Sequence, residues 1–317
     1  MNQAEIDFFR EQGISYLGII AQGGYGVVYE VISAKYKSNF ALKKIPEKMF
    51  SQSEIECLKA IDDPRIVRLY QVYNFGGFIY LLMELCKNDL DKIYKHKKMT
   101  TPEELFKVIH DTVLAVKACH DRHIAHSDIK PANFLIDQYD RIKISDFGLS
   151  SCYENDSKCC LFKGTKLFMA PEIFSKTDYD PFSADIWSLG VTIYYIATHH
   201  YPFVDKNLDK IPDLIMKGEY PDFRIKDPDL REVVRCCLTK EVSQRCNVNE
   251  LLQLPYFQNQ IQQQGLIQLS ISRGHLMIVK PMIPKRKSAF GIEQISSLTN
   301  FKCMRLHLNK SEAKFDL

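Results

Sequence analysis

Three polar side chains stand close together in an otherwise apolar stretch of this chain, residues 126–135. Asp128 is followed by Lys130 two residues on and by Asn133 five residues on. This spacing predicts one short loop that carries all three groups. Asp146 comes eleven residues after the stretch ends, at the head of an Asp-Phe-Gly sequence, and we expect it on a neighbouring turn. Any fold of this chain has to hold these four side chains in place.

The residue types in this loop suit phosphoryl transfer from ATP to an alcohol. Asn133 and Asp146 offer hard oxygen ligands of the kind that Mg²⁺ prefers, usually together with substrate phosphates. Lys130 could place a positive charge on the phosphoryl group, and Asp128 could accept the proton of the attacking hydroxyl. We therefore predict Asp128, Lys130 and Asn133 as catalytic residues. Asn133 and Asp146 are the predicted magnesium ligands.

The loop resembles the catalytic loop of the eukaryotic protein kinases, and Asp146 with the next two residues resembles their metal-binding motif. Further motifs in that family's order extend the resemblance over residues 14–258. It implies the α+β, bilobal protein kinase fold, with a small β-rich N-lobe at about residues 14–85 and a larger helical C-lobe at about residues 86–258. Residues 259–317 then form a basic C-terminal tail.

A glycine-rich turn joins two predicted strands, residues 14–21 and 26–33, which are rich in β-branched and aromatic residues. In the kinase family such a turn covers the ATP phosphates, because glycines let backbone N–H groups approach the anion. The family's first glycine is replaced by alanine here. Residues 1–13 are predicted to be a short lead-in. The residues that the resemblance assigns to this side of the nucleotide are Ala21, Gly23, Gly24, Gly26 and Val28.

A third strand is predicted at residues 40–44, and Lys43 falls where the family's lysine contacts ATP. Ala41 on the same strand is expected to contact the nucleotide. Adjacent strand residues point to opposite faces, so Lys44 is predicted to be a surface lysine. Glu54, on the next predicted helix, resembles the glutamate that pairs with the family's lysine. Only ten residues separate it from Lys43, so this helix should be short at its N-terminal end.

A strand at residues 78–86 is predicted to end at the family's hinge between the two lobes. By that resemblance Glu84 and Cys86 offer backbone groups to adenine, and Met83 lies behind the adenine pocket. A place in a plain buried strand would equally account for Met83.

Further motifs resemble structural parts of the kinase C-lobe. The Ala-Pro-Glu motif that ends at Glu172 closes the activation segment, and Glu172 is expected to pair with Arg245. Asp185 precedes an uncharged, apolar stretch, residues 187–204. We predict this stretch as a helix buried on all sides, since its polar residues make it a poor membrane span. The carboxylate of Asp185 is expected to hold the catalytic loop from below.

Composition limits the partners and the cell compartment. The net charge of +3 is too small to indicate nucleic acid as the main partner. Ten cysteines at irregular spacings indicate reduced thiols in a cytoplasmic or nuclear protein. Residues 273–317 hold nine Lys or Arg against three Asp or Glu. This tail could be an autoinhibitory or localising segment that binds a regulatory protein, or a solvated disordered segment.

The substrate follows from the resemblance as well. Lys130 falls at the position that marks Ser/Thr-directed kinases, and Thr165 is expected to contact Asp128. We predict an ATP-dependent kinase that phosphorylates Ser/Thr hydroxyls of protein substrates, with dual specificity open. Residues 148–150 and 164–172 resemble the calmodulin-dependent kinase group. The catalytic loop also resembles that of the dual-specificity spindle-checkpoint kinases.

Two other functions remain alternatives. A small-molecule phosphotransferase usually lacks a segment such as residues 164–172, which this chain has. A pseudokinase acting as a scaffold would lack one of the chemical residues. Ser127 stands where most of the family has an arginine that docks a phosphate of the activation segment, so we expect activity to depend little on such phosphorylation. The four residues whose loss would indicate a pseudokinase are all present: Lys43, Asp128, Asn133 and Asp146.

Overall fold

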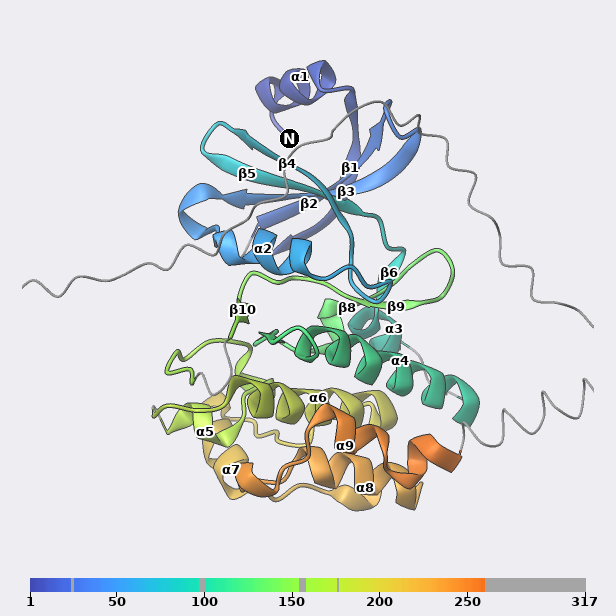
Figure 1. The fold of residues 1–317 in the computed structure, drawn as a ribbon, viewed down its shortest axis with the longest axis vertical. Helices are drawn as coiled ribbons and strands as arrows, with labels where there is room; N and C mark the ends of the chain where they lie inside the picture. Colours follow the sequence, from blue (N-terminus) through green and yellow to red (C-terminus); the bar gives the residue numbers. More distant parts are fainter. Residues whose placement is uncertain (24–25, 97–100, 154–157, 176, 260–317) are drawn as a thin grey trace, which may run out of the picture. The chain divides into compact units, whose positions relative to one another are not determined.

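The computed structural model of this 317-residue chain describes residues 1–23, 26–96, 101–153, 158–175 and 177–259. All of them belong to one compact unit, Met1–Ile267. Within it a five-stranded sheet, the N-lobe, comes first and a group of helices, the C-lobe, follows; Figure 1 shows the sheet above the helices. Gly24 of the predicted phosphate turn and the tail from residue 260 onward lie outside the described residues.

The N-lobe sheet is antiparallel throughout, in the order β1-β2-β3-β5-β4. β-branched and aromatic residues, which pack well on a pleated surface, fill its strands. The strands predicted from the sequence are confirmed. Lys43 on β3 lies opposite Val28 on β2 and Leu81 on β5, so the predicted ATP lysine occupies the central strand. The strands are β1 (Ile14–Gly23), β2 (Gly26–Ser33), β3 (Ser38–Pro46), β4 (Leu69–Phe75) and β5 (Phe78–Glu84).

Helix α2 (Gln52–Ala60) packs on one face of this sheet, after a single 3-10 turn, η1 (Glu47–Met49). It begins only two residues before Glu54, so it is short at its N-terminal end, as the spacing predicts. The side chain of Cys57 is fully buried, and Glu54 itself is 2% exposed. Glu54 therefore lies in the first helical turn, where the helix dipole favours a carboxylate.

The prediction that residues 1–13 form a lead-in is wrong, because they contain helix α1 (Gln3–Glu11). The helix starts with a capping box. The side chain of Asn2 accepts a hydrogen bond from the Glu5 backbone N–H at 2.9 Å, and the Glu5 carboxylate accepts one from the Asn2 N–H at 3.1 Å. These two bonds satisfy backbone donors that a helix start otherwise leaves free.

The buried face of α1 is aromatic. Phe9 is 1% exposed and packs edge-on against Tyr80, with ring centroids 4.8 Å apart, and Phe8 stacks on Phe75 at 4.3 Å. These rings belong to a second hydrophobic core, distinct from the large core that α2 and the C-lobe share. Helix α1 therefore covers the face of the sheet opposite α2 (Figure 1).

The prediction that Lys44 is a surface lysine is also wrong. Strand alternation does turn Lys43 and Lys44 to opposite faces, but Lys44 enters the face that α1 covers. Its ammonium pairs with the buried carboxylate of Glu5 and lies 3.9 Å from the centre of the Phe78 ring. Burial would raise the pKa of Glu5, yet the hydrogen bonds from Lys44 and Asn2 hold it below the ordinary value of 4.5. The pair is therefore ionic.

Replacing Glu5 by Gln should lower the free energy of unfolding by about 1–3 kcal/mol at neutral pH, because the ammonium of Lys44 loses its charged partner. The pKa of the Glu5 carboxyl is lower in the folded than in the unfolded protein. Its contribution is therefore complete above the ordinary carboxyl pKa and is lost as the pH falls through the folded value. In urea unfolding, the difference between the wild type and Glu5→Gln should close in acid.

Asp7→Asn is the matched control for this measurement. Asp7 pairs with Arg10 on the exposed side of the same helix, where an ion pair contributes little. This variant should unfold like the wild type at every pH. A Glu5→Gln deficit that stays the same from neutral to acid pH would contradict the ionic role of the carboxylate.

The C-lobe is arranged around α6 (Pro181–Thr198). Asp180 caps the start of this helix by accepting hydrogen bonds from two backbone N–H groups, and the next residue is a proline, which suits a first turn. The helix ends at His199, whose φ is +59°. Trp187 and Tyr194 are fully buried, which confirms the predicted buried helix for residues 187–198; residues 199–204 of the predicted stretch lie beyond its end. The other helices are α3 (Leu90–His96), α4 (Pro102–His120), α5 (Pro171–Phe174), α7 (Ile211–Lys217), α8 (Pro228–Cys237) and α9 (Val248–Leu252).

Short strands frame the loop that carries the predicted catalytic residues. β7 lies just before it, a 3-10 turn contains its asparagine, and β8 lies just after it. β8 pairs with β9, which leads to Asp146, so the loop and the Asp-Phe-Gly turn become neighbours. The short strands are β6 (Asn88–Asp89), β7 (Ile124–Ala125), β8 (Phe134–Ile136), β9 (Ile142–Ile144) and β10 (Ser151–Cys152). The remaining 3-10 turns are η2 (Pro131–Asn133), η3 (Lys166–Phe168), η4 (Leu208–Lys210), η5 (Asp222–Arg224) and η6 (Val242–Gln244).

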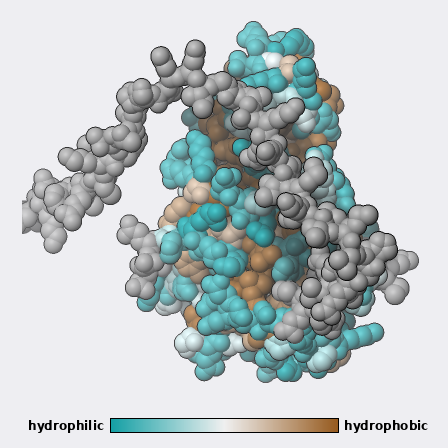
Figure 2. Space-filling model, turned by 45° about the vertical axis from the view of Figure 1, so that its right-hand side comes forward, coloured by the Kyte–Doolittle hydropathy of each residue, from teal (hydrophilic) through white to brown (hydrophobic). Residues whose placement is uncertain are grey.

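The surface is mixed in character. On the face drawn in Figure 2, brown apolar residues lie in recesses between teal polar ones. None of the helices in the described part of the chain combines the length and the apolar character that a bilayer-spanning segment requires.

Candidate active site

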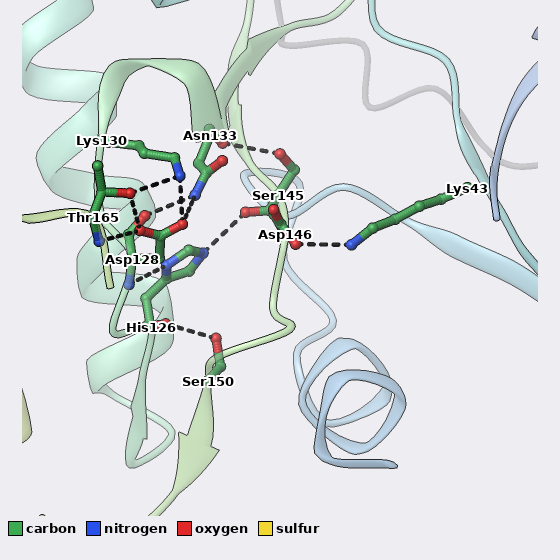
Figure 3. A network of polar contacts seen from close by, with 9 residues as sticks. All are labelled: Lys43, His126, Asp128, Lys130, Asn133, Ser145, Asp146, Ser150 and Thr165. Atoms are coloured by element: carbon green, nitrogen blue, oxygen red, sulfur yellow. Dashed lines mark hydrogen bonds and ion pairs between the residues drawn. The ribbon is translucent and has the colours of Figure 1, made fainter. Parts of the chain in front are cut away.

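Lys43 connects the sheet to α2 and to the turn after β9. Its ammonium nitrogen Nζ lies 2.7 Å from Oε1 of Glu54 and 2.8 Å from Oδ1 of Asp146. The predicted pair of Lys43 with Glu54 is thus present. Helix α2 begins two residues before Glu54, and this start places the carboxylate within reach of Lys43 on β3. In Figure 3 Lys43 reaches from its strand toward Asp146.

The three groups shift one another's pKa in a largely buried place. Burial alone would lower the pKa of Lys43, but Asp146 and Glu54 raise it above its ordinary value, so the side chain is an ammonium. Burial raises the pKa of Glu54, against the effect of Lys43. Burial would raise the pKa of Asp146, but Lys43, His126 and Lys130 together hold it below the ordinary value. Asp146 is therefore an anion, in a left-handed backbone conformation with φ of +65°.

The carboxylate of Asp128 is held by four hydrogen bonds. Its Oδ2 accepts from Nζ of Lys130 at 2.7 Å and from the side-chain amide of Asn133 at 3.2 Å. Its Oδ1 accepts from the hydroxyl of Thr165 at 2.8 Å and from the Thr165 backbone N–H at 3.1 Å. The predicted contact between Thr165 and Asp128 is confirmed, and Figure 3 shows this cluster. Fixed donors of this kind orient a proton acceptor without any rearrangement during the reaction.

Asn133 and Asp146 fit a hard cation. The amide nitrogen of Asn133 donates to the backbone carbonyl of Asp128 at 2.7 Å as well as to its carboxylate. The amide oxygen is the atom left for a ligand. Asp146 contributes an ionised carboxylate, and Ser145 beside it donates its hydroxyl to the Asn133 carbonyl at 3.1 Å, which joins the two segments (Figure 3). One carboxylate and one amide oxygen, with water and phosphate, match the usual ligand set of Mg²⁺.

A cleft of about 300 Å³ lies between the sheet and the C-lobe and reaches Lys43, Asn133 and Asp146. Its size lies in the range of small-molecule sites. A smaller hollow of about 200 Å³ shares Lys43 and Asp146 with it and is also lined by Glu54 and Asp128. The reactive groups therefore meet at one end of the cleft. The predicted nucleotide contacts that line the cleft are Ala21, Val28, Ala41, Lys43, Glu84 and Cys86.

The glycine turn is described only in part. Gly23 ends β1 and Gly26 begins β2, while Gly24 lies outside the described residues. A Cβ on Gly26 would lie 2.0 Å from the carbonyl oxygen of Lys44, and its φ is +141°. Gly26 is therefore required by the close approach of β2 to β3, the strand that carries Lys43.

The predicted hinge residues lie at the other end of the cleft. The backbone N–H of Glu84 donates to the carbonyl of Arg68 at 2.9 Å, so its own carbonyl is the group it can offer to a ligand. Burial and the neighbouring Glu84 raise the pKa of the Cys86 thiol to about 12. The thiolate is therefore scarce at neutral pH, and Cys86 is a lining residue rather than a nucleophile.

A model of the protein kinase domain family matches residues 14–257, about three quarters of the chain. The chain belongs to the protein kinase domain family. The match starts at the first strand of the sheet and ends at residue 257, five residues beyond α9. It therefore covers both lobes of the kinase fold, including every residue discussed for the cleft, but not helix α1.

Curated relatives of this kinase domain are themselves named as kinases. CBL-interacting protein kinase 10 of Oryza sativa subsp. japonica is 31% identical over 251 residues, which are 75% of this chain and 55% of that protein. Calcium-dependent protein kinase 5 of Plasmodium berghei (strain Anka) is 32% identical over 307 residues, 92% of this chain and 53% of the relative. Sperm motility kinase Z of Mus musculus is 32% identical over 207 residues, which are 65% of this chain and 42% of that protein. The chain spans about half the length of the curated relatives it matches.

The kinase catalytic loop is fixed from below by Asp185, as predicted. One carboxylate oxygen accepts from the backbone N–H of His126 at 2.7 Å and the other from that of Ser127 at 2.8 Å. The ring of His126 also lies 3.0 Å from the carbonyl of Ser145 (Figure 3) and meets Phe147 edge-on. The sequence motifs predicted no role for His126. Its position two residues before Asp128, the predicted proton acceptor, is the signal that could have found it.

The predicted pair of Glu172 and Arg245 is confirmed. The guanidinium of Arg245 donates to both carboxylate oxygens of Glu172, at 2.6 and 3.0 Å, and its side chain is completely buried. It also donates to the carbonyls of Ser183 and Thr239 and lies 5.1 Å from the centre of the Trp187 ring. The pair ties the end of the activation segment, which we define as residues 146–172, to the base of the C-lobe of the kinase.

Proposed function

We propose that this protein is a Mg²⁺-ATP-dependent protein kinase that phosphorylates Ser/Thr hydroxyls of protein substrates. The observation that carries the proposal is the meeting of two triads at one end of the cleft. Lys43 bridges Glu54 and Asp146. Beside them the Asp128 carboxylate is held by Lys130 and by a threonine of the activation segment.

The residues divide the work of phosphoryl transfer among them. Lys43 would hold ATP phosphates, and Glu54 keeps its ammonium in place. Asn133 and Asp146 would hold Mg²⁺, which when bound neutralises charge on the phosphates. Asp128 orients the attacking hydroxyl and accepts its proton. The chemistry is mostly positioning and charge stabilisation, so the prearranged hydrogen bonds of the site are what the protein contributes.

A lysine two residues after the catalytic aspartate supports the choice of Ser/Thr substrates. Lys130 donates to Asp128 and, at 3.0 Å, to the hydroxyl of Thr165. A further relative, CBL-interacting serine/threonine-protein kinase 18 of Arabidopsis thaliana, is 30% identical over 251 residues, and its name supports the same choice. A dual-specificity kinase is the second candidate, on the likeness of the catalytic loop to that of the spindle-checkpoint enzymes. A pseudokinase is disfavoured, because all four chemical side chains are present and converge.

The test is a kinase assay with purified protein, Mg²⁺-ATP and an array of peptides that present Ser, Thr or Tyr. We expect label on Ser and Thr peptides, and none after the metal is chelated. Equal label on Tyr peptides would favour dual specificity. Nucleotide binding without any transfer would favour a pseudokinase and contradict the proposal.

Phosphatase treatment should leave the activity unchanged. In most of the family a phosphate on the activation segment docks on an arginine at the position of Ser127, and a serine cannot form that pair. The measurement is the rate of peptide phosphorylation before and after treatment, with mass spectrometry to confirm removal of phosphate. A loss of activity that is restored by phosphorylation between Ser150 and Thr165 would contradict this expectation.

The substrates, the cellular location and the role of the basic tail are further proposals. We propose protein substrates and a cytoplasmic or nuclear place of action, the latter on cysteine usage alone. The basic tail, proposed to bind a regulatory protein, lies outside the described residues. Its role can be tested by comparing the activity of the full chain with that of a chain ending at residue 259.

A further inference from the structure

Lys163 connects the two arms of the activation segment. Its ammonium donates to the backbone carbonyl of Leu149, near the start of the segment, at 2.7 Å, and lies 3.5 Å from the hydroxyl of Ser151. Leu149 and Lys163 are fourteen residues apart in sequence. One side chain thus closes a loop in the part of a kinase that a phosphate often organises.

The first arm of the segment is a fixed anchor. The hydroxyl of Ser150 donates to the carbonyl of His126 at 3.0 Å, and the N–H of Tyr153 donates to the carbonyl of His123 at 2.8 Å. β10 pairs with β7, which precedes the catalytic loop. The carbonyl that Lys163 bonds is therefore held by the catalytic loop itself.

The second arm passes from Lys163 directly over the catalytic loop. Gly164 has a φ of +109°, and a Cβ there would lie 2.8 Å from the carbonyl oxygen of Ser127. The next residue, Thr165, makes two of the four hydrogen bonds to the Asp128 carboxylate. A contact that fixes Lys163 therefore also helps to fix Thr165, two residues further on, and with it the orientation of the Asp128 carboxylate.

Lys163 makes its bond to the carbonyl in a place that is partly shielded from water. The side chain is half-buried, and burial lowers its pKa, against the effects of Cys159 and Asp185. A charged donor shielded from water bonds a carbonyl more strongly than an exposed one does. Ser127, the residue at the family's phosphate-docking position, has no cation to offer. In the described part of the segment, the cation that bonds the first arm is Lys163 of the chain itself.

We propose that Lys163 is a positioning residue that organises the activation segment in place of a docked phosphate, acting on Asp128 through Thr165. This inference rests on the proposed kinase activity and specifies its regulation. The segment is held in its working arrangement by an internal ammonium, so no modifying kinase is needed to assemble the site.

Three variants of the full-length protein test this proposal. Lys163→Gln removes the charge, Lys163→Arg keeps a cationic donor, and Lys158→Gln removes an equal charge from an exposed position on the same segment. We expect Lys163→Gln to lower kcat about 10-fold or more, the change expected when a charge-assisted hydrogen bond is lost. The KM for ATP should stay the same, because the nucleotide cleft is not lined by Lys163. Lys163→Arg should restore most of the rate, and Lys158→Gln should match the wild type.

A second measurement does not depend on activity. Chymotrypsin should cut after the exposed Phe162 faster in Lys163→Gln than in the wild type or in Lys158→Gln, with the melting temperature of the whole domain unchanged. Wild-type kinetics and wild-type cleavage in Lys163→Gln would overturn the inference. So would an equal loss in Lys163→Arg, or a fall in kcat that follows a fall in melting temperature. An inactive wild type would refute the kinase proposal instead, and the cleavage rates would still decide the role of Lys163.

Discussion

The Asp128→Asn variant should lose about 10²–10⁴-fold in kcat, the contribution typical of a positioned general base. Asparagine keeps the size of the side chain, but its single acceptor oxygen can serve either Lys130 or Thr165 and not both. The loop should still stay folded, because Asp185 holds its backbone at His126 and Ser127. It cannot take the proton of a substrate hydroxyl. The measurement is the steady-state rate of peptide phosphorylation at saturating Mg²⁺-ATP.

The controls separate chemistry from binding and folding. ATP affinity should be unchanged, because Asp128 does not line the nucleotide cleft. The exposed carboxylate of Asp140, which pairs with Lys87 on the surface, provides the matched substitution, and Asp140→Asn should have wild-type kcat. If Asp128→Asn retains the wild-type rate with an unchanged dependence on pH, another group accepts the proton and the assignment is wrong.

The Glu172→Gln variant should be destabilised by about 3–5 kcal/mol, because the guanidinium of Arg245 would remain buried without its counter-charge. Arg245 is completely buried and donates to both oxygens of Glu172. For a domain of this size, each kcal/mol corresponds to a change of about 2–4 °C in melting temperature. We therefore expect calorimetry to show a fall of about 6–20 °C.

A second arginine–carboxylate pair in the C-lobe is the control. Asp222 accepts from Arg235 at 2.7 Å, but this pair lies on the surface. Asp222→Asn should leave the melting temperature nearly unchanged, since water solvates both charges. Equal effects of the two substitutions would mean that burial does not determine the strength of these pairs.

Local sequence was sufficient to predict the reactive end of the cleft. Asp128, Lys130 and Asn133 are within six residues of one another, so any folded loop keeps them close. The strand pair β8 and β9 brings Asp146 to them, and the eleven-residue spacing suggested such a turn. The pairing of Lys43 with Glu54 came only from the resemblance to a family, because strand alternation indicates a face of the sheet but not its partner.

The predictions for residues 1–13 and for Lys44 were wrong because tertiary contacts determine both structures. Alternation correctly separated Lys44 from Lys43, but no rule of strand geometry shows that a helix covers the far face. That helix could have been found, since Asn2 and Glu5 have the spacing of a capping box. The bond from Lys163 to Leu149 could not have been predicted, because it depends on how the thirteen residues between them fold back.

Helix α1 has a consequence for how far this kinase domain extends. The family match begins at residue 14, and a chain cut there would leave the aromatic face around Tyr80 bare and Lys44 without its carboxylate. Exposed apolar patches of this kind promote association. In this protein the part of the chain that folds as one stable unit includes α1, and it therefore begins before the part that matches the family.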